Sequence, residues 1–93
     1  MGIRYADHLQ QRLALRQIPA ELVEAVYREA PERFRDVVTG YVIAADRRVV
    51  AGRERDVIVV YEEEPGGVVL ITFHPLRDSE KAHRLAGRRW TPV

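Results

Sequence analysis

The stretch VIVVYEEEPGGVVLITF (57–73) constrains the fold of this chain more than any other part of its sequence. Two runs of β-branched and aliphatic residues flank an acidic turn that contains Pro65, Gly66 and Gly67. Proline fixes one φ angle of such a turn, and glycine adopts positive φ angles without steric cost. The pattern therefore predicts a β-hairpin at the centre of a sheet.

Further β-branched segments lie upstream of this hairpin, within residues 33–52. They read RFRDVV, YVIAAD and RRVVAG, and Gly40 and Gly52 punctuate them. Together with the hairpin they predict an antiparallel meander of about four strands.

Two helices are expected before the sheet. Apolar residues at helical spacing predict a first helix over residues 5–16. Pro19 suits the first turn of a second helix, which should end before Pro31. With a short C-terminal helix, the expected fold is α+β, in which two N-terminal helices pack on one face of a four-stranded antiparallel sheet.

The two strands of the hairpin are apolar on both faces, although a half-solvated antiparallel sheet would alternate apolar and polar residues. Two helices can cover only one face. The segment from Ser79 to Arg89, capped by Asp78 or Ser79, predicts a last helix that closes at Gly87 and could fold over the other face. A second chain is the alternative cover, since large exposed apolar patches usually mark contact surfaces. We therefore expect self-association or a protein partner at this open sheet face.

The length of 93 residues predicts a single domain, 1–93, with a modest core. The chain has no cysteine, which removes disulfide frameworks and thiolate metal sites. It has no apolar run of about eighteen residues and no cationic segment followed by an apolar one at its start. Neither a membrane span nor a secretory signal is expected, and a cytoplasmic location fits best.

The charge of the chain is small in total but unevenly spread. The net charge of +1 is unlike the clear basic excess of most nucleic-acid binders. Residues 1–18 hold three arginines against Asp7, and residues 77–93 hold five cations against two carboxylates. Both ends are therefore positive, whereas the stretch 54–64 is acidic.

Three nitrogen-bearing side chains, His8, Arg12 and Arg16, follow one another at intervals of four residues in the first helix. A helical wheel places them on the shoulder of the apolar stripe, between Leu13 and Leu15. A semi-buried cation needs an anionic partner, because leaving it unpaired costs on the order of several kcal/mol. That partner is either a carboxylate of the protein itself or a phosphate of a ligand.

The segment HLQQRLALRQIPAELVEAVYREAPE resembles the opening of an uncharacterised domain family related to BrnT-type toxins, within the RelE/ParE toxin superfamily. The matching residues are His8, Arg12, Arg16, Ile18 and Pro31, and the later RDVIVVYEE and VVLITFHP resemble the strands of the family's central hairpin. The resemblance covers about residues 5–75. It implies a RelE/ParE-like fold and a toxin-type domain of a toxin–antitoxin system that acts on RNA or the ribosome, with an antitoxin as partner.

A metal-independent endoribonuclease of the kind that this resemblance implies uses attack of a ribose 2′-OH on the adjacent phosphate. The reaction needs a base, an acid and cations for the charge that grows on the phosphoryl oxygens. His8 or His74 could act as acid or base, and Arg12 and Arg16 could clamp the phosphate. The alternative is that both arginines form structural ion pairs within a non-catalytic interaction module or a homodimeric protein of the same fold.

Tyr61 and His74 are the remaining candidate catalytic residues, one on each strand of the central hairpin. If Glu63 pairs with Val68, Tyr61 and His74 share one sheet face, opposite Leu70 and Val57 respectively, whereas a one-residue slip sends His74 to the other face. On a shared face they would lie about 13 Å apart, too far for a hydrogen bond. A core aromatic is the simpler interpretation of Tyr61. The histidines lack metal-ligand spacing, so neither a metal nor a cofactor is expected.

Overall fold

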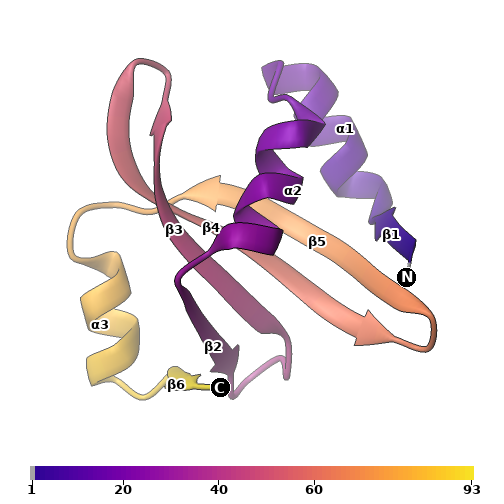
Figure 1. Cartoon of the computed structure of the whole chain (residues 1–93). Coiled ribbons are helices and arrows are strands. Elements are labelled where there is room, and N and C mark those ends of the chain that lie inside the picture. The colour runs from indigo at the N-terminus through magenta and orange to yellow at the C-terminus, as the bar shows by residue number, and fades with distance from the viewer. Residues whose placement is uncertain (1) are drawn as a thin grey trace.

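The computed structural model describes residues 2–93 and shows a single sheet flanked by three helices (Figure 1). In chain order the elements are β1 (Gly2–Tyr5), α1 (Asp7–Arg16), α2 (Ala20–Glu29), β2 (Glu32–Asp36), β3 (Val42–Val50), β4 (Arg53–Glu64), β5 (Gly67–Pro75), α3 (Glu80–Ala86) and β6 (Trp90–Pro92). The predicted α+β class is confirmed. No helix among residues 2–93 is long and apolar enough to cross a membrane.

The sheet has six strands in the order β1-β5-β4-β3-β2-β6, so the prediction of four strands is wrong in number. The antiparallel meander from β2 to β5 is present as predicted. Two short strands extend it: β1 pairs with β5 in parallel, and β6 pairs with β2 in antiparallel fashion, which makes the sheet mixed. These edge strands have four and three residues, too few for an alternating pattern to be recognised in the sequence.

The acidic turn between β4 and β5 uses its two glycines for different purposes. Gly66 has a φ angle of 79°, which is the role expected of a turn glycine. Gly67 instead begins β5 opposite Gly2 of β1. A Cβ atom on Gly67 would lie 2.2 Å from the carbonyl oxygen of Gly2, so the close approach of β1 requires a residue without a side chain.

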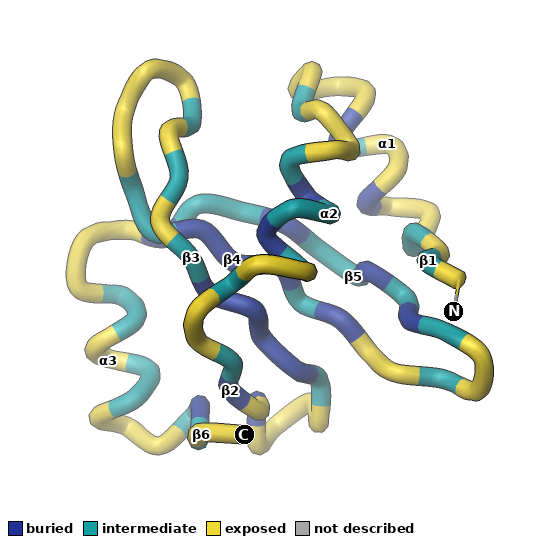
Figure 2. Tube along the Cα trace, viewed as in Figure 1, coloured by how far each residue is buried: buried dark blue, intermediate teal, exposed yellow. Residues whose placement is uncertain are grey.

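The helices α1 and α2 pack on one face of the sheet, mainly against β5 and against β3 and β4 respectively. We call this the first face. Its buried core consists of Leu9, Leu13, Val23, Val26, Val42, Ala44, Val57, Val59, Tyr61, Val68, Leu70 and Phe73. Figure 2 shows this burial along the middle of the sheet, whereas the tip of the β3–β4 hairpin is exposed.

The opposite face, which we call the second face, has a smaller core of its own. It consists of Phe34, Ile43, Ala45, Ile58, Leu76 and Trp90, against which Leu85 of α3 packs. The ring of Trp90 stacks on Phe34 with the two centroids 5.8 Å apart. The C-terminal segment therefore covers part of this face. This was one of the two alternatives that the sequence allowed, the other being a second chain.

A buried carboxylate ties the segment after α3 to the β2–β3 turn. Asp36 accepts hydrogen bonds from Nε of Arg89 at 2.8 Å and from the backbone N–H groups of Val38 and Thr39. The backbone N–H of Val37 donates to the carbonyl oxygen of Arg89 at 2.9 Å. The bond from Arg89 holds the pKa of the Asp36 carboxyl below its usual value, although burial opposes the shift. Arg89 is thereby fixed at the rim of the second face.

Candidate functional site

The row of His8, Arg12 and Arg16 lies beside the buried stripe of α1, which contains Leu9 and Leu13. Leu13 is buried, as the helical wheel predicted, but Leu15 is 84% exposed. The prediction that apolar residues bracket the row on both sides is therefore wrong. The helix packs chiefly against β5 near the edge of the sheet, so only one side of it meets the core. Arg12 is half-buried, and His8 and Arg16 are exposed.

None of these three side chains takes part in a side-chain hydrogen bond or an ion pair within residues 2–93. Two of the three carboxylates of α2 have other partners, and Glu21 forms no ion pair within residues 2–93. Glu24 binds Tyr5 and Arg28, and Glu29 binds Arg48. The part of the chain that the structure describes thus leaves both arginines of the row free to meet an anion from outside.

A β-bulge in β5 determines which face of the sheet His74 occupies. The pairs Glu63–Val68 and Tyr61–Leu70 are formed as predicted, but the register then shifts by one residue between Val60 and Tyr61. The extra residue on β5 is Ile71, and beyond it His74 pairs with Ile58 instead of the predicted Val57. The prediction that Tyr61 and His74 share one face is therefore wrong, because the bulge absorbs one residue and leaves His74 on the second face.

Tyr61 lies on the first face as a core aromatic. It is 4% exposed, and its ring meets the ring of Tyr27 edge-on with centroids 4.9 Å apart. Its hydroxyl accepts a hydrogen bond from Nη1 of Arg33 at 3.0 Å. The sheet separates Tyr61 from His74, so the structure does not bring these two candidates together.

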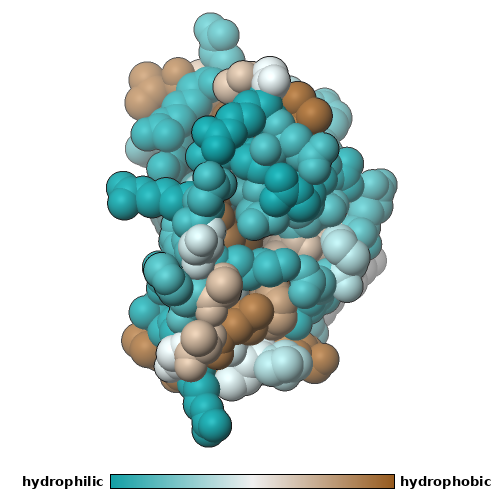
Figure 3. Space-filling model, turned by 90° about the vertical axis from the view of Figure 1, so that its left-hand side faces the viewer, coloured by the Kyte–Doolittle hydropathy of each residue, from teal (hydrophilic) through white to brown (hydrophobic). Residues whose placement is uncertain are grey.

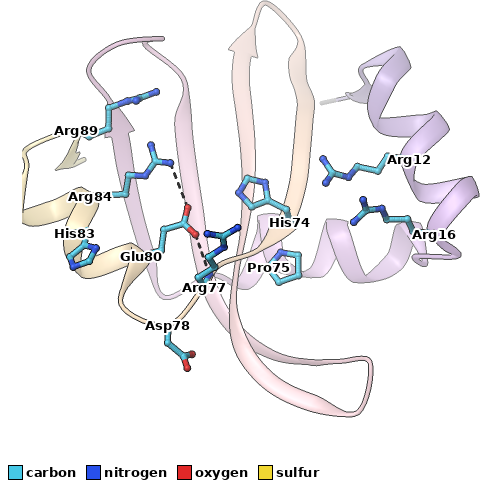
Figure 4. Close-up of a pocket in the computed structure, with 10 residues that line it drawn as sticks. All are labelled: Arg12, Arg16, His74, Pro75, Arg77, Asp78, Glu80, His83, Arg84 and Arg89. Carbon is cyan, nitrogen blue, oxygen red and sulfur yellow. Dashed lines mark hydrogen bonds and ion pairs between the residues drawn. The ribbon is translucent and has the colours of Figure 1, made fainter.

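A cleft between α1 and α3 contains most of the other candidates. It has a volume of about 980 Å³, and we call it the basic cleft. Figure 4 shows Arg12 and Arg16 on the α1 side, His74 from β5 between the two helices, and His83 and Arg84 on the α3 side. The row on α1 therefore faces His74 and α3.

Positive charge dominates the lining of the basic cleft, where five guanidinium groups stand against the two carboxylates of Asp78 and Glu80. Glu80 is paired with Arg84 at 3.5 Å, and its carboxylate also accepts the backbone N–H of Arg77 at 3.1 Å. Asp78 is paired with Arg53, outside the lining of the cleft, at 3.5 Å.

Three arginines of the lining remain without a partner among residues 2–93, namely Arg12, Arg16 and Arg77. Unpaired guanidinium groups that face one hollow suit an anion with several oxygens, because each group offers a planar fork of donors.

His74 is half-buried where the basic cleft meets a second hollow. Burial lowers the pKa of its imidazole below the ordinary value, and the charges of Arg12 and Arg84 lower it further, whereas Glu80 raises it. At neutral pH the ring is therefore mainly uncharged, which is the form that accepts a proton.

The second hollow, which we call the apolar pocket, has a volume of about 290 Å³. Aliphatic side chains from β3, β4 and β5 line it, together with Trp90, and His8 reaches it from α1. His74, Glu80, Arg84 and Arg89 line both hollows. Seen from the side of α3, the surface is mostly hydrophilic and exposes only small hydrophobic patches (Figure 3).

We did not predict Arg77 or Arg84 as members of the site from the sequence. A signal for them existed, because residues 1–18 and 77–93 are the two positive stretches of the chain. The fold brings both stretches to the rims of one cleft. Among residues 2–93 no group of three or more His, Asp or Glu side chains is arranged to bind a metal ion.

No protein-family model, curated protein or solved structure matches this chain.

Proposed function

We propose that this chain is a toxin-type domain of the RelE/ParE kind and that it cleaves RNA, without a metal ion, in the basic cleft. The supporting observation is the set of unpaired arginines, Arg12, Arg16 and Arg77, around the half-buried His74. Although its net charge is only +1, the chain gathers these free guanidinium groups beside one histidine. Arginine binds phosphate oxygens through two parallel hydrogen bonds, so an RNA backbone fits such a lining.

The chemistry follows from the charge of each group. His74, mainly neutral because its pKa is lowered, accepts the proton of a ribose 2′-OH. The 2′-oxygen attacks the adjacent phosphorus, and the bond from phosphorus to the 5′-oxygen breaks. His8, which shares the apolar pocket with His74, donates a proton to the departing 5′-oxygen. Arg12 and Arg16 stabilise the negative charge on the non-bridging oxygens. The products are a 2′,3′-cyclic phosphate and a free 5′-hydroxyl.

The test is an RNA cleavage assay in the presence of EDTA, on free RNA and on ribosome-bound RNA, with product ends identified by mass spectrometry. We expect cyclic phosphate ends and a rate that falls by roughly 10²–10⁴ in His74→Ala, because a general base contributes about that much. Arg16→Gln should also lower the rate. Arg88→Gln is the matched control, since Arg88 is exposed and lies outside the lining of the cleft.

Two results would contradict this function. One is the absence of cleavage on every RNA tested while the melting temperature of the protein is normal. The other is cleavage that persists unchanged in both His74→Ala and Arg16→Gln, since the active groups would then lie elsewhere.

The small net charge of the chain favours a second candidate, a non-catalytic module whose basic cleft binds an acidic protein segment such as that of an antitoxin. This candidate predicts that an acidic peptide binds the cleft, that Arg16→Gln weakens the binding and that no RNA is cleaved. Cleavage in the EDTA assay separates the two candidates.

A further inference from the structure

We infer that the apolar pocket is a subsite for one unpaired nucleobase, so that the basic cleft and the apolar pocket together select single-stranded RNA. This inference rests on the proposed function, because it places the base of a nucleotide whose phosphate lies in the basic cleft.

The two hollows adjoin each other, and this adjacency is the first observation that supports the subsite. His74, Glu80, Arg84 and Arg89 line both of them. A phosphate held between Arg12 and His74 therefore has the apolar pocket as its direct neighbour. A nucleotide likewise joins a charged phosphate to an uncharged planar base. With the phosphate in the basic cleft, the base can therefore lie in the adjacent apolar pocket.

The lining of the apolar pocket suits a base. Its lining includes Ile43, Ile58 and Val60, together with two residues that carry hydroxyl groups, Tyr41 and Thr72. Within residues 2–93 neither of these two hydroxyls forms a side-chain hydrogen bond, so both are available to a ligand. Apolar walls with a few free polar groups are typical of small-molecule sites. The volume of about 290 Å³ is at the low end for such sites, which favours a single ring system.

The cationic rim favours a base of RNA over an apolar side chain of a protein or a lipid tail. The guanidinium group of Arg84 lies over the ring of Trp90, 5.8 Å from its centroid, and Arg89 stands on the same rim. Arginine planes and aromatic side chains are the groups on which proteins stack splayed RNA bases. A base within a duplex cannot enter such a pocket, because it must first leave its stack. The expected ligand is therefore unpaired RNA.

Trp90 provides a direct readout of this subsite. It is the one tryptophan of the chain and it lines the apolar pocket, so its fluorescence responds to a base bound there. The probe is a short oligouridylate with 2′-O-methyl groups, which block the attacking oxygen and prevent cleavage. The matched probe is a 2′-O-methyl ribose-phosphate strand of the same length without bases. A duplex of the same length is the third probe.

We expect the oligouridylate to bind at least about fivefold tighter than the baseless strand, because stacking of one base is worth roughly 1–3 kcal/mol. It should change the fluorescence of Trp90, whereas the baseless strand and the duplex should not. Thr72→Phe fills the apolar pocket and should abolish the advantage of the bases while affinity for the baseless strand is unchanged. Tyr41→Leu, a milder second variant, should reduce that advantage. Val69→Phe, on the same strand but outside the lining, is the control and should behave as the wild type.

Each other outcome overturns the inference in a recognisable way. Equal affinity of the wild type for the oligouridylate and the baseless strand removes the base subsite but leaves the proposed phosphate cleft. Failure of the wild type to bind any strand, free or in cleavable form, removes the proposed function as well. A base-dependent gain that leaves Trp90 unchanged, or that persists in both pocket variants, means that bases bind elsewhere.

Discussion

At the scale of single residues, the charge of His74 depends on what surrounds it. Burial is the main reason that its pKa lies below the ordinary value of about 6.5. Among its charged neighbours, Glu80 acts against burial, while Arg12 and Arg84 act with it. Because the pKa in the folded state lies below that in the unfolded state, the neutral ring costs no stability above about pH 6.5. Stability then falls as the pH drops from that value through the folded-state pKa.

The neighbours of His74 can be tested one at a time by following its ring protons against pH by NMR. Glu80→Gln should lower the pKa of His74 further, because the variant removes the negative charge that raises it. Arg84→Gln should raise the pKa toward its ordinary value, because it removes a positive charge. Glu62→Gln, an exposed change at the far end of β4, should leave the titration as in the wild type. Shifts of equal sign in Glu80→Gln and Arg84→Gln would contradict this account.

Some of the candidate site could be predicted from the sequence because helical spacing is a local property. The positions of His8, Arg12 and Arg16 on one side of a helix follow from their intervals of four residues. The face occupied by His74 could not be predicted, because the bulge at Ile71 interrupts the alternation on which such a prediction depends. Arg77 belongs to one of the two positive stretches of the chain, but only the tertiary structure shows that this stretch lies across a cleft from α1.

At the scale of elements, the loop of the β3–β4 hairpin adopts a backbone geometry that does not suit its first residue, Ala51. Its loop consists of Ala51 and Gly52, since Val50 pairs with Arg53. Both loop residues have positive φ angles, 54° and 77°, which is the geometry of a type I′ turn. Glycine adopts this conformation freely, but alanine is strained in it. The segments YVIAAD and RRVVAG, which no glycine separates, contribute the residues of the single strand β3 that leads into this loop.

Replacing the strained residue should stabilise the hairpin. Ala51→Asn creates the Asn-Gly pair that type I′ turns prefer, so we expect the free energy of unfolding to rise by up to about 1 kcal/mol. Urea denaturation measures the change as a higher midpoint with an unchanged slope. The opposite control is Ala51→Val, whose β-branched side chain should lower the midpoint. A lower midpoint for Ala51→Asn would mean that the loop has a different geometry in solution.

The elements themselves could be predicted where they are long. The helices α1 and α2 and the four central strands are long enough for their periodicity to be recognised in the sequence. The edge strands β1 and β6 are formed by pairing with partners that are distant in the sequence, and that pairing leaves no local periodicity. Strand number was therefore the main error in the predicted fold.

At the scale of the whole molecule, the uneven distribution of charge along the chain becomes a distribution in space. The stretches near residues 12–16 and 77–89, which the sequence separates widely, line one cleft from opposite sides. The acidic residues Glu62 and Glu63 lie at the far end of the hairpin strands, outside the lining of the cleft. A nearly neutral protein can therefore present one positive surface, so net charge alone is a poor guide to what this chain binds.

Salt dependence tests this distribution of charge. The logarithm of the association constant for single-stranded RNA should fall linearly with the logarithm of the salt concentration, with a slope of about −0.7 for each neutralised phosphate. Arg16→Gln should make the slope less negative by about 0.7, since it removes one phosphate contact. Arg88→Gln should leave the slope as it is, although both variants remove one positive charge. Equal slopes for the two variants would show that binding senses total charge and not the basic cleft.

The bulge at Ile71 also determines how relatives of this chain should be aligned. Without Ile71, β5 would run as a regular strand, with Leu70 and Phe73 on the first face and His74 still opposite Ile58. The loss of this one residue is therefore compatible with the core and the basic cleft, although it would remove one apolar wall of the apolar pocket. An alignment that places a single-residue gap in the middle of β5 would describe a physically permitted difference between homologues, and a search that forbids gaps within strands would miss such relatives.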